Sequence, residues 1–301
     1  MPELPEVETV ARDLAAKVTG ATIRAVAWSW DRSIRHPTPP DRFAEELRGA
    51  RIARVGRRAK SVLLHLDDGR VVTVALRMTG ALLVVPRGTP PDPYVRVVLQ
   101  LDDERELRFR DVRKFGRIGL WAPGAVRTAR PRRGRPRCRS VADERTPYSV
   151  RDVFARHGPE PLAGSFSAAR LAARLEGRRA RLKTLLLDQS FVAGIGNIYA
   201  DEALWCARLH PLRAADTLDA GEVARLHRAI RAVLRQAVAN RGSSFSDYTD
   251  ADGRPGDNQD RLSVYRRTGE PCLRCGRPIA RVVVGQRSTH FCPRCQPEDG
   301  R

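Results

Sequence analysis

Residues 272–295 read CLRCGRPIARVVVGQRSTHFCPRC, and this stretch decides the fold of the C-terminal end of the chain. It contains two Cys-x-x-Cys pairs that are 16 residues apart: Cys272, Cys275, Cys292 and Cys295. This spacing is typical of a four-thiolate zinc site in a hairpin finger, and such a closed site leaves no position for a water ligand. We expect one structural Zn²⁺, with strands at 279–284 and 288–291 and a tip at 285–287. A redox role for either pair would need a thioredoxin-like context, which the sequence lacks.

The other two cysteines, Cys138 and Cys206, stand alone in the sequence. Cys206 is predicted to be a small core residue on a helix. The N-terminus reads MPELPEVE, with two prolines and three carboxylates where a secretory signal would have basic and then apolar residues. We therefore expect a cytoplasmic protein, and in that compartment the cysteines are not expected to pair as disulfides.

The chain of 301 residues carries a strong positive charge, because 55 Lys and Arg residues against 35 Asp and Glu give a formal net charge of +20. Such a field attracts a polyanion, and nucleic acid is the expected partner. A membrane surface is the other polyanion to consider, but no stretch approaches the roughly 20 consecutive apolar residues that span a bilayer. A GC-rich genome, which favours Arg and Ala, is the alternative explanation for part of the charge.

The first half of the chain reads as one helix followed by short strands. Residues 5–19 place Val7, Val10 and Leu14 on one apolar stripe, and Gly20 ends the helix. Short β-branched runs separated by turn signals then follow: 61–66, 71–76, 81–85, 94–101 and 106–109. This pattern predicts a β-sandwich or barrel of about 120 residues that carries one N-terminal helix.

The second half is predicted to be helical and to begin after an Arg-rich linker. Residues 124–139 hold seven arginines, two prolines and no acid, which is typical of a solvated linker or a disordered tether. Helical periodicity follows in five segments: 150–154, 167–175, 181–187, 197–206 and 220–239. The expected fold class is α+β with two domains. The expected boundaries are a catalytic β-sandwich at 1–123, the linker at 124–148, the helical domain at 149–256 and the finger at 257–301.

The N-terminal segment offers a nucleophile once Met1 is removed, as is usual before a small second residue. Pro2 then has a secondary amine with a pKa near the α-amino range of about 8, so part of it is unprotonated at pH 7. Such an amine can attack the sugar C1′ of a nucleoside and form an iminium, which is an electron sink. Glu3 can move protons to or from the sugar oxygen or the base, and Glu6 can orient the amine. Taken alone, the same residues could merely cap a helix.

Six motifs occur in the order that is seen in one family: PELPEVE at 2–8, RAK at 58–60, DVRKFG at 111–116, GPEPL at 158–162, GIGNIYA at 194–200 and the cysteine pairs. The chain resembles the formamidopyrimidine-DNA glycosylase family over residues 2–296. Leu4 favours the formamidopyrimidine branch, because the endonuclease VIII branch typically has Gly there. The resemblance implies a bacterial DNA-repair enzyme that works at the nucleoid. It also implies a monomer that binds damaged double-stranded DNA and no membrane.

The resemblance implies an activity as well, namely removal of 8-oxoguanine and formamidopyrimidines followed by β,δ-elimination at the abasic site. Pro2 would be the Schiff-base nucleophile and Glu3 the proton donor or acceptor. Lys60 resembles the family's phosphate-binding and proton-donating lysine. Arg287, at the tip of the finger, resembles the arginine that grips the phosphates beside the lesion.

Further residues match the family's DNA-holding positions. Lys183 and Asn197 correspond to phosphate-binding residues of a helix-two-turn-helix, and Asn197 opens a glycine-rich helix start whose N–H groups suit an anion. A glycosylase must evert its target base and fill the gap that is left. Met78, Arg113 and Phe115 resemble the three residues that fill it, although Met78 and Phe115 taken singly would more often be core residues.

Residues 242–259, rich in Gly, Ser and Asp, resemble the mobile loop that closes over the everted base and chooses the lesion. Two positions depart from the family. Ala75 stands where His is frequent, and Asn258 stands before Gln259 where an aromatic is common. These departures leave the lesion less defined than the reaction, so alkylated, ring-opened or oxidised pyrimidine bases remain alternative substrates.

Two readings from other classes compete with the enzyme. A non-catalytic DNA-binding protein would keep the finger and the helix-two-turn-helix, but it has no need for Pro2, Glu3 and Lys60 together. A zinc-ribbon transcription or RNA-binding factor explains the charge and the cysteines but not the N-terminus.

Overall fold

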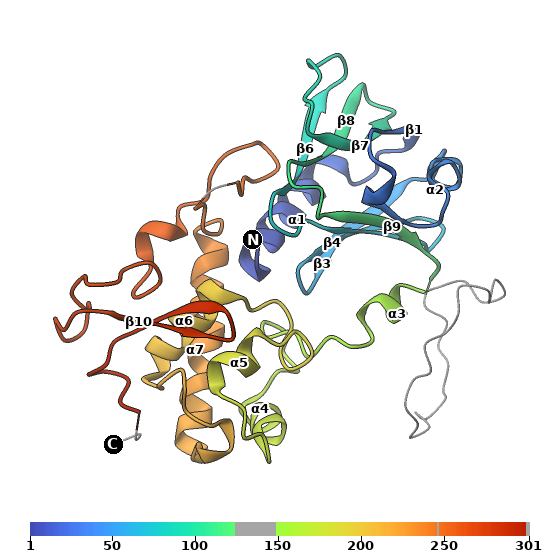
Figure 1. The fold of residues 1–301 in the computed structure, drawn as a ribbon. Coiled ribbons are helices and arrows are strands. Elements are labelled where there is room, and N and C mark those ends of the chain that lie inside the picture. Colours follow the sequence, from blue (N-terminus) through green and yellow to red (C-terminus); the bar gives the residue numbers. More distant parts are fainter. Residues whose placement is uncertain (124–148, 246, 299–301) are drawn as a thin grey trace.

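The computed structural model describes residues 1–123, 149–245 and 247–298, which form two lobes (Figure 1). The first lobe, residues 1–123, is a β-sandwich with helices at its side. The second lobe, residues 149–298, is helical and ends in a small hairpin. The predicted Arg-rich linker 124–148, with Cys138, lies outside the described residues.

Helix α1 (Leu4–Val18) begins the first lobe and confirms the predicted N-terminal helix, one residue earlier at each end. Its apolar stripe is fully buried, since Val7, Leu14 and Val18 have no exposed surface. Gly20, at φ +90°, turns the chain away from the helix, a conformation that glycine adopts without strain. Its N–H then donates to the Ile52 carbonyl at 2.7 Å.

The sandwich consists of a four-stranded and a five-stranded sheet. The first has the order β1 (Ile23–Trp28), β7 (Val95–Leu101), β8 (Arg105–Asp111) and β6 (Gly80–Pro86). The second has the order β2 (Ile34–His36), β9 (Arg117–Trp121), β5 (Val71–Ala75), β4 (Ser61–Leu66) and β3 (Ile52–Arg58). All pairs are antiparallel except β2 with β9. The five predicted strands are therefore confirmed, as β4 to β8.

The first lobe also contains a helix that the sequence pattern did not predict, α2 (Pro40–Leu47). The expectation of a single helix was thus incomplete. A proline at the first helical position favours a helix start, and Phe43 and Leu47 lie four residues apart on one face. Both side chains are fully buried in the sandwich core. The helix has only eight residues, too few for its periodicity to be distinguished from the strands around it.

The second lobe confirms the five predicted helices, with bounds that shift by one residue at most. They are α3 (Val150–Phe154), α4 (Ala168–Leu175), α5 (Leu182–Leu187), α6 (Asn197–Ala207) and α7 (Ala220–Ala239). Short 3-10 turns occur at Asp31–Ser33, Ala215–Thr217 and Asn258–Arg261. Helix α6 lies at the centre of this lobe, where it packs against α5, α7 and β11. In the described part of the chain, no helix combines the length and apolarity needed to cross a membrane.

The finger is a hairpin of β10 (Ala280–Val284) and β11 (Arg287–Phe291). Gly285 and Gln286 form its two-residue turn, and both have positive φ, which suits the twist of a tight hairpin. Arg287 was predicted at the tip, and it is the first residue of β11, directly after the turn. It therefore projects from a rigid element.

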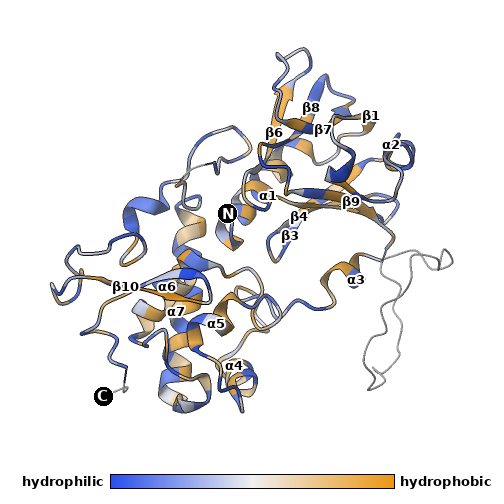
Figure 2. Ribbon diagram, viewed as in Figure 1, coloured by the Kyte–Doolittle hydropathy of each residue, from blue (hydrophilic) through white to orange (hydrophobic). Residues whose placement is uncertain are grey.

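The two lobes share core residues. Leu4, at the start of α1, is fully buried in the core of the second lobe. Conversely, Tyr248 and Ala251 follow α7 in the chain but lie in the core of the first lobe. Apolar residues, drawn in orange, occur along the helices and strands of both lobes (Figure 2). Because each core is completed by the other part of the chain, the site between the lobes is built on a fixed framework.

Candidate active site

A cavity of about 650 Å³ is lined by residues of both lobes. It brings together five of the predicted site residues with one wedge residue: Pro2, Glu3, Lys60, Asn197, Arg287 and Met78. The volume lies within the range of small-molecule sites, which is about 300–1,000 Å³. The cavity can therefore hold a single everted nucleotide. Arg113, Phe115 and Lys183 are not part of its wall.

Glu3 occupies the N-terminal end of helix α6. Its buried carboxylate accepts the N–H groups of Gly196 at 2.6 Å and Ile198 at 2.9 Å. Such N–H groups and the helix dipole stabilise an anion. From the sequence, these N–H groups are expected to suit an anion, and in the structure the Glu3 carboxylate accepts two of them. A Cβ on Gly196 would lie 2.4 Å from the Glu3 Cδ atom, which explains why glycine precedes the helix.

Glu6 is buried beside Glu3 and holds the N-terminal segment. One carboxylate oxygen accepts the Glu3 N–H at 2.7 Å. The other accepts the Ser243 N–H at 2.8 Å and a very short hydrogen bond from the Tyr199 hydroxyl. Burial, and then repulsion from Glu3, raise the pKa of Glu6. The predicted orienting role thus has a geometric basis, since Glu6 binds the backbone next to Pro2.

Lys60 lies in the turn between β3 and β4, directly after Ala59 with φ +52°. Among the described residues, no hydrogen bond or ion pair is found for its ammonium group. Burial lowers the pKa of Lys60, while the charges of Glu3 and Glu6 oppose this and that of Arg287 adds to it. An amine of this kind can give up and regain a proton closer to neutral pH than an ordinary lysine.

Glu160 positions the turn that carries Lys60, a role that the sequence did not reveal although Glu160 lies in the quoted GPEPL motif. Its carboxylate contacts the Arg57 guanidinium at 2.7 Å and the Arg58 guanidinium at 2.6 Å. It also accepts the Ala59 N–H at 2.6 Å. The carboxylate thus crosses from the second lobe and fixes the turn that carries Lys60.

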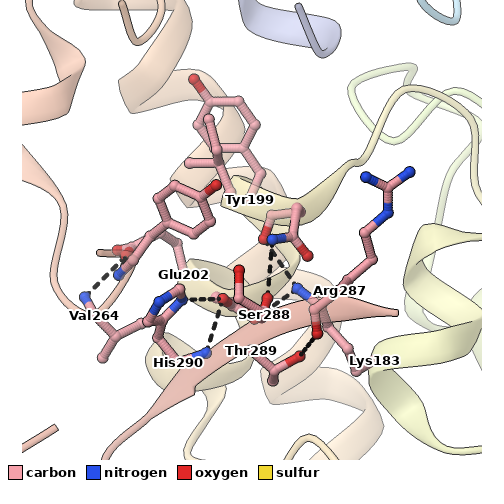
Figure 3. Close-up of polar contacts among 12 residues, drawn as sticks. Lys183, Tyr199, Glu202, Val264, Arg287, Ser288, Thr289 and His290 are labelled. Atoms are coloured by element: carbon pink, nitrogen blue, oxygen red, sulfur yellow. Dashed lines mark hydrogen bonds and ion pairs between the residues drawn. The ribbon is translucent and has the colours of Figure 1, made fainter. Parts of the chain in front are cut away.

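Lys183 belongs to a buried cluster behind the finger (Figure 3). Its Nζ donates to Asp201 at 2.6 Å and to the Asn197 carbonyl at 2.9 Å, and its side chain has no exposed surface. The second Asp201 oxygen accepts the His290 N–H at 2.9 Å and lies 3.0 Å from His290 Nδ1. In this structure Lys183 therefore joins α5, α6 and β11, and it does not face solvent as a phosphate ligand would.

Asn197 ties the same helix to the finger. Its Nδ2 donates to the Ser288 carbonyl at 2.9 Å, next to Arg287. Its Oδ1 is buried without a hydrogen-bond partner among the described residues. The side chain thus positions β11 and leaves one polar atom unsatisfied at the cavity wall, where a donor could bind.

The predicted wedge residues lie on two loops that are locked together. Met78 and Phe115 are 38% and 49% exposed, so neither is the core residue that it would more often be. Buried Asp111 joins the loops, because it accepts the Gly116 N–H at 2.7 Å and the Thr79 hydroxyl. The Arg113 N–H donates to the same hydroxyl at 3.0 Å, and the Arg113 guanidinium lies 5.1 Å from the Phe115 ring centroid.

Several hydrogen bonds join residues 242–259 to one another and to Glu6. Ser243 bonds Glu6, and Asn258 Nδ2 donates to the Ser243 hydroxyl at 2.9 Å. The Ser244 N–H donates to Gln259 at 3.0 Å. Because Tyr248 is also buried in the core of the first lobe, the described part of this stretch contacts both lobes. Asn258, a departure from the family pattern, is thus a buried hydrogen-bonding residue.

The four finger cysteines form one cluster whose sulfur atoms lie within 4.8 Å of one another. Cys272 and Cys295 are 3.9 Å apart, and Cys275 and Cys292 are 3.4 Å apart. Four thiolates at this spacing fit the tetrahedral ligands of one structural Zn²⁺. Backbone N–H groups of Arg274 and Cys295 point at two of the sulfurs and would balance their charge. The zinc prediction is confirmed.

The prediction for Cys206 was wrong, because this residue is exposed on α6. Its neighbours explain the error. Leu204 and Ala207 cover the buried side of the helix, and Cys206 falls on the opposite side. It is also far in sequence from the four-cysteine cluster and takes no part in it.

Three family models match the chain. They describe the formamidopyrimidine-DNA glycosylase N-terminal domain at residues 1–118, the formamidopyrimidine-DNA glycosylase H2TH domain at 157–249, and the zinc finger found in FPG and IleRS at 269–297.

Curated relatives match along the whole chain. Formamidopyrimidine-DNA glycosylase of Roseiflexus sp. (strain RS-1) is 48% identical over 297 residues, which covers 98% of this chain and 100% of the relative. The protein of the same name from Herpetosiphon aurantiacus is 46% identical over 299 residues, with coverage of 98% and 100%.

Solved structures of known proteins are also similar to the chain in sequence and in fold. The MutM (Fpg) protein from Thermus thermophilus is 41% identical, with a TM-score of 0.81 and 99% of each chain covered. Lactococcus lactis Fpg in complex with abasic-site DNA is 31% identical, with a TM-score of 0.83 and coverage of 98% and 99%. MutM in complex with DNA that contains carbocyclic 8-oxo-G is 32% identical, with a TM-score of 0.83 and coverage of 98% and 100%.

Proposed function

The chain belongs to the formamidopyrimidine-DNA glycosylase family, and from this premise we propose how its own residues carry out the reaction. It is a base-excision repair enzyme, a bifunctional glycosylase and abasic-site lyase for oxidised purines such as 8-oxoguanine. One observation supports the residue roles above all others. Pro2, Glu3, Lys60 and Arg287, which are far apart in sequence, line a single cavity.

The first step is attack by the Pro2 amine on the sugar C1′ of an everted nucleotide, after Met1 has been removed. The bond from C1′ to the base breaks, the base leaves with a proton, and the sugar ring opens to an iminium on Pro2. Glu3 lies beside Pro2 and moves the proton to or from the sugar oxygen. Its carboxylate is held by α6, so it reaches the reacting atoms without reorganising.

The second step is strand cleavage. The iminium draws electrons from the sugar, so loss of a C2′ proton expels the 3′ phosphate, and a further elimination expels the 5′ phosphate. Lys60, with a lowered pKa, donates a proton during these steps and binds phosphate when it is charged. Arg287, held at the end of the hairpin, binds the phosphates beside the lesion.

The protein holds damaged double-stranded DNA between the lobes, and relatives have been crystallised with such DNA. Asn197 contributes at the α6 end of the site, and buried Lys183 supports it from behind through its bond to the Asn197 carbonyl. Met78 and Phe115 are exposed, so they can enter the stack when the base leaves, and Arg113 pairs with the orphaned base. The enzyme acts as a monomer in the bacterial cytoplasm, and the zinc keeps the finger folded.

Borohydride trapping on an 8-oxoguanine duplex tests these roles. The wild-type enzyme should become covalently linked to DNA, and mass spectrometry should place the link on the Pro2 nitrogen. A Pro2→Leu variant keeps Met1, because the second residue is no longer small, and should not be trapped although it still binds DNA. A link that maps to a lysine in the wild-type enzyme would refute Pro2 as the nucleophile. Parallel duplexes with formamidopyrimidine and with oxidised pyrimidines define the lesion range.

A further inference from the structure

Arg266 has a backbone conformation that its side chain does not favour. It has φ +63°, and it lies in a turn closed by the hydrogen bond from the Arg267 N–H to the Val264 carbonyl at 3.1 Å. A third turn residue with positive φ is characteristically glycine. The chain nevertheless places an exposed arginine there, and strained positions of this kind concentrate at functional sites.

The turn is built firmly enough to impose this conformation. Buried Glu202, on α6, accepts the N–H groups of Ser263 at 2.8 Å, Val264 at 2.9 Å and Tyr265 at 2.9 Å (Figure 3). Three backbone hydrogen bonds to one carboxylate fix the chain up to the residue before Arg266. The side chain of Arg266 therefore leaves the backbone in a set direction.

That direction brings the Arg266 guanidinium over the ring of Phe245, at 4.5 Å from the ring centroid. Tyr265 lies beside the same ring, with centroids 5.5 Å apart. A cation at this distance over an aromatic face is attracted by the ring. Arg266 thus covers one face of the Phe245 ring, Tyr265 packs against the ring at an angle of 55°, and all three residues line the cavity that contains Pro2.

The position of Phe245 along the chain connects it to the reacting atoms. Ser243, two residues earlier, donates to Glu6, and Glu6 accepts the N–H of Glu3. Two residues span at most about 7 Å of chain. The ring is therefore close in the chain to the contacts that hold the N-terminal segment, and it lines the same cavity as Pro2, in which the base attached to the attacked sugar must lie.

We propose that Phe245 is the surface on which the everted base stacks, and that Arg266 is the positioning residue that orients the Phe245 ring. This inference rests on the proposed function, and it deepens it by assigning residues that act on the base and not on the sugar or the phosphates. Aromatic rings bind bases by stacking without regard to the base's hydrogen-bonding edge. Phe245, oriented by Arg266, would therefore hold any of several different oxidised purines in the cavity.

Two DNA duplexes distinguish stacking of the base on Phe245 from a role in binding the DNA backbone. One duplex carries 8-oxoguanine, and the other has the same sequence with a preformed abasic site and so offers no base to stack. Phe245→Ala and Arg266→Gly should each slow single-turnover excision of 8-oxoguanine roughly ten-fold, as expected from loss of one stacking contact. Both should leave abasic-site cleavage unchanged within about two-fold. The midpoint temperature of thermal unfolding should not be lower for Arg266→Gly than for wild type, because glycine relieves the strain at this position.

Arg208→Gly is the matched control. Arg208 also has positive φ, at +58°, but it ends α6 and does not line the cavity, so this variant should behave as wild type with both substrates. Excision that is unchanged in both test variants would overturn the proposal. An equal loss with both substrates would also overturn it, because Arg266 would then act on the DNA backbone. Wild-type enzyme that neither excises the base nor cuts the abasic site would overturn the proposed function itself.

Discussion

Helix α6 carries two buried polar clusters that differ in their charge balance. At its N-terminal end lies the acid pair, Glu3 and Glu6, whose oxygens accept hydrogen bonds from backbone N–H and hydroxyl groups. One turn later lies the ion-pair cluster of Lys183, Asp201 and His290, in which a cation and a carboxylate meet directly. Both clusters are almost without solvent exposure.

The difference separates residues that position from residues that react. A buried charge with a direct partner is inert and joins structural elements, and its loss leaves the partner unpaired. Two carboxylates that share one pocket without a directly bonded cation repel each other, and this repulsion, together with burial, raises the pKa of Glu6. Accordingly, substitutions in the ion-pair cluster should mainly lower the free energy of unfolding, and substitutions in the acid pair should mainly slow the reaction. Four substitutions test this division.

Asp201→Ala should have the largest effect, and it should fall on stability. The change leaves buried Lys183 and His290 without their carboxylate, which costs about 3–5 kcal/mol in comparable cases. Urea unfolding measures the loss. Glu104→Ala is the control, because Glu104 is 74% exposed in its pair with Arg87 and should cost at most about 1 kcal/mol. Equal losses in the two variants would contradict the structural role of the cluster.

Glu3→Gln should have the next largest effect, and it should fall on activity. Loss of a positioned proton-transfer group should slow single-turnover excision roughly 10²–10³-fold. The free energy of unfolding should fall by about 1–3 kcal/mol, because the amide accepts only one of the two buried N–H groups and leaves the other without an acceptor. Glu45→Gln, on the exposed side of α2, should match wild type in both assays. A variant that excises at the wild-type rate would show that Glu3 is only a helix cap.

Glu6→Gln should change how stability depends on pH. A carboxyl group whose pKa is raised by folding stabilises the protein below its ordinary value of 4.5, and this contribution is lost as pH rises through the raised pKa. The free energy of unfolding of wild type relative to the variant should therefore fall on the order of 1–2 kcal/mol as pH is raised from about 4 to 8. Denaturant titrations at several pH values measure this difference. A constant difference would mean that Glu6 does not titrate in this range.

Lys60→Arg should have the smallest effect, a loss of about a few-fold near pH 7, because a guanidinium keeps the phosphate-binding charge but donates a proton poorly. Because burial lowers the pKa of Lys60, this group loses its proton at a pH below 10.5, the ordinary pKa of a lysine. As the pH is raised, wild-type cleavage of an abasic duplex should therefore begin to decline before pH 10.5 is reached. A guanidinium stays charged, so the alkaline limb of the variant should move to higher pH. At pH 9 the deficit of the variant relative to wild type should therefore be smaller than at pH 7 by about a few-fold. Lys17→Arg serves as the control, since Lys17 pairs with Asp252 away from the cavity. A limb that stays in place would exclude Lys60 as the titrating group.

The fold was predictable wherever local chemistry repeats along the chain. Helix α7 spans 20 residues with an apolar stripe, and its predicted and observed bounds agree. Helix α2 was not predicted because only two of its eight residues, Phe43 and Leu47, are buried apolar side chains. The strands before and after it have a similar composition. Cys206 was misplaced because helical periodicity identifies two sides of a helix but does not say which one faces the core.

The site was predictable as a set of residues but not as a network. The motifs contain Glu3, Asn197 and Glu160, yet nothing in the sequence shows that Glu3 fills the start of α6 or that Glu160 reaches Ala59. These bonds join residues 193 and 101 positions apart. Long-range pairing of this kind depends on how the lobes dock, and only the assembled structure reveals it.

The exchange of core residues between the lobes has a consequence for how the enzyme is made. A ribosome releases Pro2 and Glu3 first, but Leu4 has no core to enter until residues of the second lobe have emerged. The sandwich in turn lacks Tyr248 and Ala251 until most of the chain has been synthesised. Neither lobe can therefore finish folding early. An incomplete nascent chain already carries the Pro2 amine, but the cavity around that amine is completed only by residues that are synthesised last, up to Ser288.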